Sequence, residues 1–181
     1  MLRVVTMAML VRAVDADASV QTAAAVFLAA QVALAYTVSG ISKAQSRMWW
    51  NGDAIRGIFS TQYFGVRALA RLVDRHQWLA TALGLSVVAW ESCFALAMLA
   101  DARVTSVALF IAATFHLASG FIMGLDGFLL PFLSTFPAVV FVAARMNAIL
   151  SPLSRVAIAA VMACVLTGWM CHWQATTRHA R

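Results

Sequence analysis

Charged residues are scarce in this chain. Of its 181 residues only 11% are Asp, Glu, Lys or Arg, whereas 63% are hydrophobic, and the mean hydropathy is +0.86. Soluble domains carry about 25% charged and about 45–50% apolar residues, and disordered chains are more polar still. The shortage of charge therefore excludes a soluble globule and a disordered chain, and it indicates an integral membrane protein.

Acidic residues are scarcer than basic ones, with seven Asp and Glu against 13 Lys and Arg, which gives a net charge of +6. The basic residues form no run interleaved with exposed aromatic residues, as a nucleic-acid surface would require. We therefore expect no nucleic-acid partner. An excess of positive charge suits anionic lipid headgroups instead, so membrane lipid is the expected partner.

Cysteine is also rare, and the three present are Cys93, Cys164 and Cys171. An odd number without a C-x-x-C pair signals neither a thioredoxin-like redox pair nor a zinc site. Cys164 and Cys171 would lie about 10 Å apart along one helix, which exceeds the reach of a disulfide. We expect all three to be apolar fillers, and we expect no metal.

Long apolar runs make up most of the chain. A membrane-spanning helix needs about 20 residues, so about five fit. The runs predict an all-α, polytopic membrane bundle with spans at residues 20–42, 78–100, 104–125, 128–144 and 154–173. Pro131 and Pro137 fall inside the fourth run and predict a kink there. Residues 1–19 are expected to be a stub or interfacial segment, and residues 174–181 a polar tail.

Residues 43–76 differ from the apolar runs because basic and aromatic side chains alternate along them. Trp and Tyr favour the level of the lipid headgroups, and Arg can extend to it. Asn51-Gly52 is a turn signal, and Asp53 is suited to capping a following helix. The segment is therefore predicted to be amphipathic and to lie in the membrane interface. The positive-inside bias, with eight basic residues on this side against five on the other, places it in the cytoplasm.

Three ionisable residues interrupt the apolar pattern: Lys43 ends the first run, Glu91 lies mid-way in the second, and His116 mid-way in the third. A charge at the centre of a bilayer costs about 2.5–3.5 kcal/mol, so such residues usually face a partner or a wet cavity. The short loop between the second and third spans predicts Glu91 and His116 at similar depth, about 5 Å apart along the helix axis.

Each of these residues also has a purely structural interpretation. Glu91 could be a protonated acid bonded to a neighbouring helix, and His116 could form an interhelical hydrogen bond. Lys43 could extend from its helix end to the headgroups. After the histidine, Gly120-x-x-x-Gly124 permits close helix approach, although this spacing is common in membrane spans.

Two sequence blocks carry a more specific signal. The first, at residues 35–55, reads AYTVSGISKAQSRMWWNGDAI and holds an aromatic residue, a glycine, a lysine, a tryptophan and a second glycine: Tyr36, Gly40, Lys43, Trp50 and Gly52. The second, at residues 114–132, reads TFHLASGFIMGLDGFLLPF. With a Glu-bearing helix between them, the blocks resemble the vitamin K-dependent gamma-carboxylase family and its bacterial relatives, the horizontally transferred transmembrane (HTTM) domain proteins. The resemblance covers roughly residues 20–144.

The resemblance implies a role for each matching position. Lys43 would be the base that deprotonates a reduced, vitamin K-like quinone, and His116 would line the same pocket and could bond a quinone oxygen. The other residues expected at the cofactor are Trp50, Glu91, Ser119 and Gly120. In the carboxylases, oxygenation of the hydroquinone yields a strong base that removes a proton from a glutamate side chain, and carbon dioxide traps the carbanion.

The chain also departs from that pattern. The carboxylases carry several spans before the first block and a large extramembrane domain after the second, whereas only about forty residues precede Lys43 here. We therefore expect either a partner subunit or homo-oligomer that completes the bundle, or a reduced relative that no longer carboxylates. A short bacterial member of this kind would reside in the inner, cytoplasmic membrane.

Three functions remain open at this stage: a quinone-dependent membrane enzyme, a non-catalytic helical subunit of a larger complex, and a small transporter. The first predicts that Lys43 and His116 face a common cavity, whereas the second predicts that they lie far apart with Lys43 at the headgroups. Because a lysine at a helix end packs little, replacing Lys43 by alanine is expected to leave the fold nearly unchanged.

Overall fold

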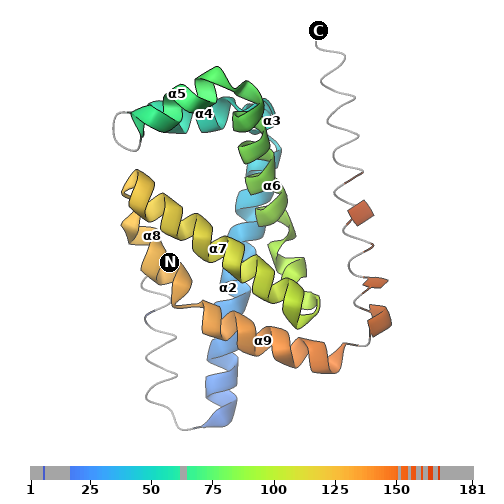
Figure 1. Cartoon of the computed structure of the whole chain (residues 1–181). Helices are drawn as coiled ribbons and strands as arrows, with labels where there is room; N and C mark the ends of the chain where they lie inside the picture. The colour runs from blue at the N-terminus through green and yellow to red at the C-terminus, as the bar shows by residue number, and fades with distance from the viewer. Residues whose placement is uncertain are drawn as a thin grey trace.

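The computed structural model describes residues 6, 17–61, 65–150, 152–154, 156–157, 160, 163–164 and 167. Within this part of the chain every regular element is a helix, which confirms the predicted all-helical class for the described residues. Figure 1 shows their arrangement. The helices are α2 (Ala18–Ala44), α3 (Arg47–Trp50), α4 (Asp53–Ser60), α5 (Arg67–Arg75), α6 (Gln77–Leu99), α7 (Ala102–Met123), α8 (Asp126–Leu133) and α9 (Phe136–Ile149).

Four helical stretches of the described residues are long and apolar enough to cross a membrane: α2, α6, α7 and residues Leu129–Ile149, which cover most of α8 and all of α9. They correspond to the first four predicted spans. Large apolar side chains on their outer faces are open to the surroundings, among them Phe110, Phe121 and Leu130. Most of the predicted fifth span at 154–173 and most of the stub at 1–19 lie outside the described residues, and the tail at 174–181 lies wholly outside them.

The ends of α2 and α7 are set by capping residues. The Asp17 carboxylate accepts the backbone N–H of Ser19 at 2.8 Å, so α2 begins two residues before the predicted start. Asp101 caps α7 in the same way, because its carboxylate accepts the N–H of Arg103 at 2.7 Å. At the other end of α7, Gly124 takes a left-handed conformation with φ 67°, which ends the helix.

The fourth span is broken between α8 and α9. Pro131 lies inside α8, and Pro137 lies in the first turn of α9, where its missing N–H costs no helical hydrogen bond. Thr135, in the turn between the two helices, is fully buried and donates its hydroxyl to the Phe132 carbonyl at 2.6 Å. The predicted kink is confirmed, but the predicted end at residue 144 is wrong, because α9 continues to Ile149.

The segment predicted to lie in the interface forms three short helices, α3, α4 and α5, and none of them is a candidate span. In Figure 1, α4 and α5 run across the end of the long helices α2 and α6. Ile55 and Val73, from α4 and α5, pack with Ala80 of α6 in one buried cluster. Gly52 permits the turn before α4, with φ 83° and Thr81 N only 2.6 Å from where a Cβ would stand. The orientation of this segment relative to a membrane stays a prediction.

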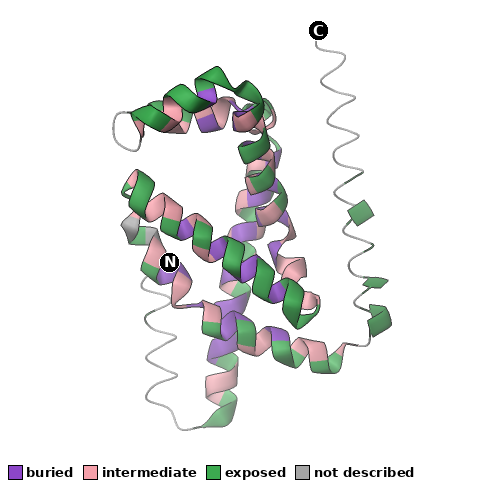
Figure 2. Cartoon of the chain, in the orientation of Figure 1, coloured by how far each residue is buried: buried purple, intermediate pink, exposed green. Residues whose placement is uncertain are grey.

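Helices α2 and α6 approach each other closely at Gly40. A Cβ at Gly40 would lie 2.6 Å from the Ser92 hydroxyl and 2.8 Å from the carbonyl carbon of Glu91, so only glycine fits there. The main core, with Val32, Tyr36 and Phe94 among its members, lies on the same side of α2. Figure 2 shows buried positions where the long helices cross and exposed positions on their outer faces. Gly40 thus brings the end of α2 that carries Lys43 against Glu91.

Candidate functional site

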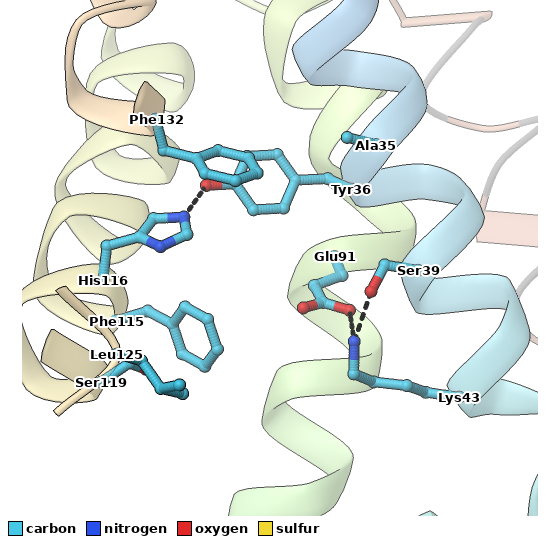
Figure 3. A pocket seen from close by; sticks show the side chains of 10 residues that line it. All are labelled: Ala35, Tyr36, Ser39, Lys43, Glu91, Phe115, His116, Ser119, Leu125 and Phe132. Carbon is cyan, nitrogen blue, oxygen red and sulfur yellow. Dashed lines mark hydrogen bonds and ion pairs between the residues drawn. The ribbon is translucent and has the colours of Figure 1, made fainter. Parts of the chain in front are cut away.

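A cavity of about 250 Å³ lies among α2, α6 and α7, with Leu125 before α8 and Phe132 near the end of α8 completing its wall (Figure 3). Its wall holds six polar residues and four apolar ones. The polar residues are Tyr36, Ser39, Lys43, Glu91, His116 and Ser119, and the apolar ones are Ala35, Phe115, Leu125 and Phe132.

The first polar unit of the cavity is an ion pair between α2 and α6. The Lys43 Nζ lies 2.5 Å from the Glu91 Oε2, and the same amine donates to the hydroxyl of Ser39, one helical turn earlier. The Glu91 side chain is only 5% exposed and that of Lys43 is 21% exposed. The amine therefore points into the bundle rather than outward to the headgroups, and each charge is balanced by the other.

The aromatic face of Trp49 also contacts this amine. The Lys43 Nζ lies 5.3 Å from the centroid of the Trp49 ring, within the range of a cation–π interaction. The Trp49 ring therefore covers one side of the amine. Trp50 lies elsewhere: its indole N–H donates to the Ala44 carbonyl at 2.7 Å, at the end of α2.

The second polar unit joins α2 to α7. The Tyr36 hydroxyl and the His116 Nε2 are 2.6 Å apart, and both side chains are buried. The Phe132 ring stacks on the imidazole with ring centroids 4.3 Å apart and an interplanar angle of 22°. This is the interhelical hydrogen bond expected from the structural interpretation of His116. It also forms an acid–base pair, because a hydroxyl and an imidazole can exchange a proton along a bond of this length.

Both polar units face the same cavity, as Figure 3 shows: Lys43 and Glu91 on one side, Tyr36 and His116 on the other. The sequence analysis predicted Glu91 and His116 at similar depth, and both lie on this cavity wall. Lys43 and His116 therefore face a common cavity, and Lys43 does not lie far from His116 as the second of the three functions predicted.

The remaining predicted residues divide into two groups. Ser119 lines the cavity, whereas Trp50 and Gly120 are not among its lining residues. Gly124 does not bring a second helix close, because a Cβ there would meet no atom within 4 Å. The second glycine of the Gly120-x-x-x-Gly124 pattern therefore ends α7 instead of packing it against a neighbour.

The sequence analysis did not assign Tyr36, Ser39, Phe115 or Phe132 to the site. For the two α2 residues the signal was present, because Tyr36, Ser39 and Lys43 are spaced i, i+3 and i+7 and therefore share one face of a helix. Phe132 reaches the cavity only because the chain reverses at Gly124 before α8, and no spacing within one helix predicts this.

A second cavity, of about 410 Å³, adjoins the first. The two share four wall residues, which are Lys43, Phe115, Ser119 and Leu125. Apart from Lys43 and Ser119, the wall of the second cavity consists of apolar side chains from α3, α4, α6, α7 and Leu125, such as Trp49, Ile58 and Ile122. The polar cavity and the apolar cavity together form an amphipathic space.

Within the described part of the chain, no three His, Cys, Asp or Glu side chains form a group that could bind a metal ion. The residues suited to holding a cofactor are the two polar pairs and the aromatic rings between them. Comparisons with protein-family models, with curated proteins and with solved structures find no match to this chain.

Proposed function

We propose that this chain is an HTTM-like integral membrane protein that binds a reduced lipid quinone and acts with it in the modification of a peptide or protein. The observation that supports this most directly is the pair of acid–base units, Lys43–Glu91 and Tyr36–His116, on one cavity within an apolar helical bundle. Ionisable residues within membrane spans are costly and generally mark functional sites. The proposed location is the bacterial cytoplasmic membrane, where a partner subunit or a second copy of the chain completes the bundle.

The chemistry of the wall fits a hydroquinone. Such a ring is flat and apolar on its faces, and it carries two oxygens that donate and accept hydrogen bonds. The two polar pairs supply both donors and acceptors, while Phe115 and Phe132 supply flat apolar contacts. The adjoining apolar cavity of about 410 Å³ suits an isoprenoid tail. Tyr36, His116, Lys43 and Glu91 would hold the ring oxygens.

A reduced quinone, when bound, supplies electrons to oxygen and so generates the strong base that a carboxylation requires. The chain's own contribution is to bind and to move protons. The Lys43 amine lies 2.5 Å from Glu91 Oε2, so a proton that moves to or from the amine can be exchanged directly with this carboxylate. The Lys43–Glu91 pair, rather than the lysine alone, is therefore the acid–base unit on this wall.

The test is a binding titration of the full-length protein in detergent micelles with menaquinone-4, followed by quenching of tryptophan fluorescence. Trp90 is a suitable reporter because its ring centroid lies 4.8 Å from that of Tyr36 and 5.4 Å from that of Phe115. We expect His116→Phe and Glu91→Gln each to weaken binding about tenfold, the effect of one lost hydrogen bond to a charged or strongly polar group.

The matched control is Phe110→Leu, because Phe110 also lies on α7 but is 73% exposed on its outer face. This variant should bind menaquinone-4 as the wild type does. Geranylgeraniol, which has the tail without the ring, measures partition into the micelle and the apolar cavity. The proposal would be contradicted if all variants bound menaquinone-4 with the same affinity, or if geranylgeraniol bound as tightly as menaquinone-4.

A second candidate function is a non-catalytic helical subunit of a larger membrane complex. One observation favours it: Lys43, Glu91, Tyr36 and His116 already bond to each other, so they could serve packing alone. This function predicts no quinone in lipid extracts of the purified protein and unchanged assembly of its complex when His116 is replaced by glutamine. A co-extracted quinone that the same substitution removes would exclude it.

A further inference from the structure

A second polar feature lies outside the bundle, between the end of α4 and one face of α5. A pocket of about 560 Å³ is bounded by residues 59–61 and Gly65 on one side. On the other side it is bounded by Arg67, Ala70, Arg71 and Asp74, which share one face of α5 because their spacing is i, i+3, i+4 and i+7. Neither polar pair of the proposed quinone site contributes to this wall.

The charge of this pocket is not balanced. Asp74 is its acidic residue, and it already binds the Nε of Arg56 at 3.1 Å. Arg67 and Arg71 are exposed, and no acidic side chain among the described residues forms an ion pair with either of them. Arg67 and Arg71 therefore border the pocket without a carboxylate partner from the described part of the chain.

The position of the pocket relative to the spans indicates what kind of anion it meets. Helix α5 ends at Arg75, and the candidate span α6 begins at Gln77, so the helix that carries Arg67 and Arg71 leads directly into a span. Trp78, in the first turn of α6, is 69% exposed, and Leu72 of α5 is 43% exposed. Exposed Trp near a span end is typical of the headgroup level. In Figure 1, α4 and α5 lie across the end of α2 and α6, which fits contact with a headgroup layer.

We propose that this pocket binds the phosphate group of an anionic phospholipid through Arg67 and Arg71. Guanidinium groups present a planar fork of donors that matches phosphate oxygens, so two of them can hold one phosphate from two sides. The site is independent of the proposed quinone function, and it would attach the α4–α5 segment to the membrane surface.

The test measures retention of phosphatidylglycerol and phosphatidylcholine by the full-length protein, purified in mild detergent, using native mass spectrometry. Arg71→Gln is compared with Arg75→Gln, a matched control on the same helix that removes the same charge outside the pocket. General attraction to an anionic surface contributes about fivefold per arginine and affects both variants equally. We expect Arg71→Gln to lower phosphatidylglycerol affinity about tenfold more than Arg75→Gln does.

If Arg71→Gln and Arg75→Gln lost the same amount of phosphatidylglycerol affinity, the proposal would be overturned, because general electrostatic attraction would then account for all of the binding. The proposal would also be overturned if the wild type retained phosphatidylcholine as well as it retains phosphatidylglycerol. Inorganic phosphate is added in a separate arm. If it displaces phosphatidylglycerol at millimolar concentration, the natural ligand is a soluble phosphate and the assignment to lipid is wrong.

Discussion

The ion pair between Lys43 and Glu91 makes a quantitative prediction about stability. The Glu91 side chain is 5% exposed, so Lys43→Met leaves a carboxylate inside the bundle without its cation. Removing one member of a buried pair typically costs about 3–5 kcal/mol. Glu91→Gln should cost less, about 1–2 kcal/mol, because the lysine left behind is 21% exposed, keeps Ser39 as a partner and can extend toward the headgroups.

The double variant Lys43→Met, Glu91→Gln separates the energy of the ion pair from the effect of replacing each side chain alone. It removes both charges, and replacing a whole buried pair is often close to neutral. We therefore expect the double variant to unfold within about 1 kcal/mol of the wild type. The second substitution would then restore most of the stability that Lys43→Met loses.

The assay is equilibrium unfolding of the full-length protein by transfer from mild detergent to SDS, followed by circular dichroism. Phe110→Leu, on the outer face of α7, is the control and should shift the midpoint little. The reasoning would be refuted if the stability loss of the double variant equalled the sum of the two single losses. It would also be refuted if Lys43→Met unfolded at the same SDS midpoint as the wild type. The second result would also restore the expectation from sequence that a lysine at a helix end hardly affects the fold.

Three further predictions follow from single contacts. Tyr36→Phe removes the hydroxyl that bonds His116 Nε2 but keeps the ring, so it should cost about 1–3 kcal/mol in the same SDS unfolding assay. Gly40→Ala should cost about 1–3 kcal/mol because its Cβ would meet α6, whereas Gly127→Ala, with no atom within 4 Å, should leave the midpoint unchanged. The N–H of Ser19 holds the pKa of Asp17 below its usual value of 3.8. The Asp17 cap should therefore be complete above pH 3.8 and should be lost as the pH falls through the lowered pKa of Asp17. Amide hydrogen exchange at Ser19 would report this loss, and protection of that amide unchanged at pH 2 would contradict it.

The helical class and four of the spans could be predicted from sequence because apolar length alone determines them. Capping residues then adjust the ends, as Asp17 and Gly124 do, and these shifts of a few residues are local effects. The break between α8 and α9 was foreseeable as well, since two prolines mark it. How the short helices α3 to α5 fold back against α6 was not, because Gly52 and Ile55 acquire their partners only in three dimensions.

For the site, the sequence identified which residues are costly in a membrane but not how they pair. Lys43, Glu91 and His116 were identified as exceptions to the apolar pattern. Their pairing depends on which face of each helix meets which neighbour, and that is determined by the close approach at Gly40. The sequence therefore left the outward-pointing lysine as an alternative, whereas the structure turns the amine toward Glu91.

One face of α2 connects the site to the stability of the bundle. Tyr36 on this face bonds α7 through His116, and Lys43 on the same face bonds α6 through Glu91. A ligand that takes hydrogen bonds from these groups must share or replace bonds that hold three helices together. Binding and helix packing therefore draw on the same contacts, so a ligand that bridges both polar pairs should stabilise the wild type, and should stabilise His116→Phe and Glu91→Gln less because they bind it more weakly.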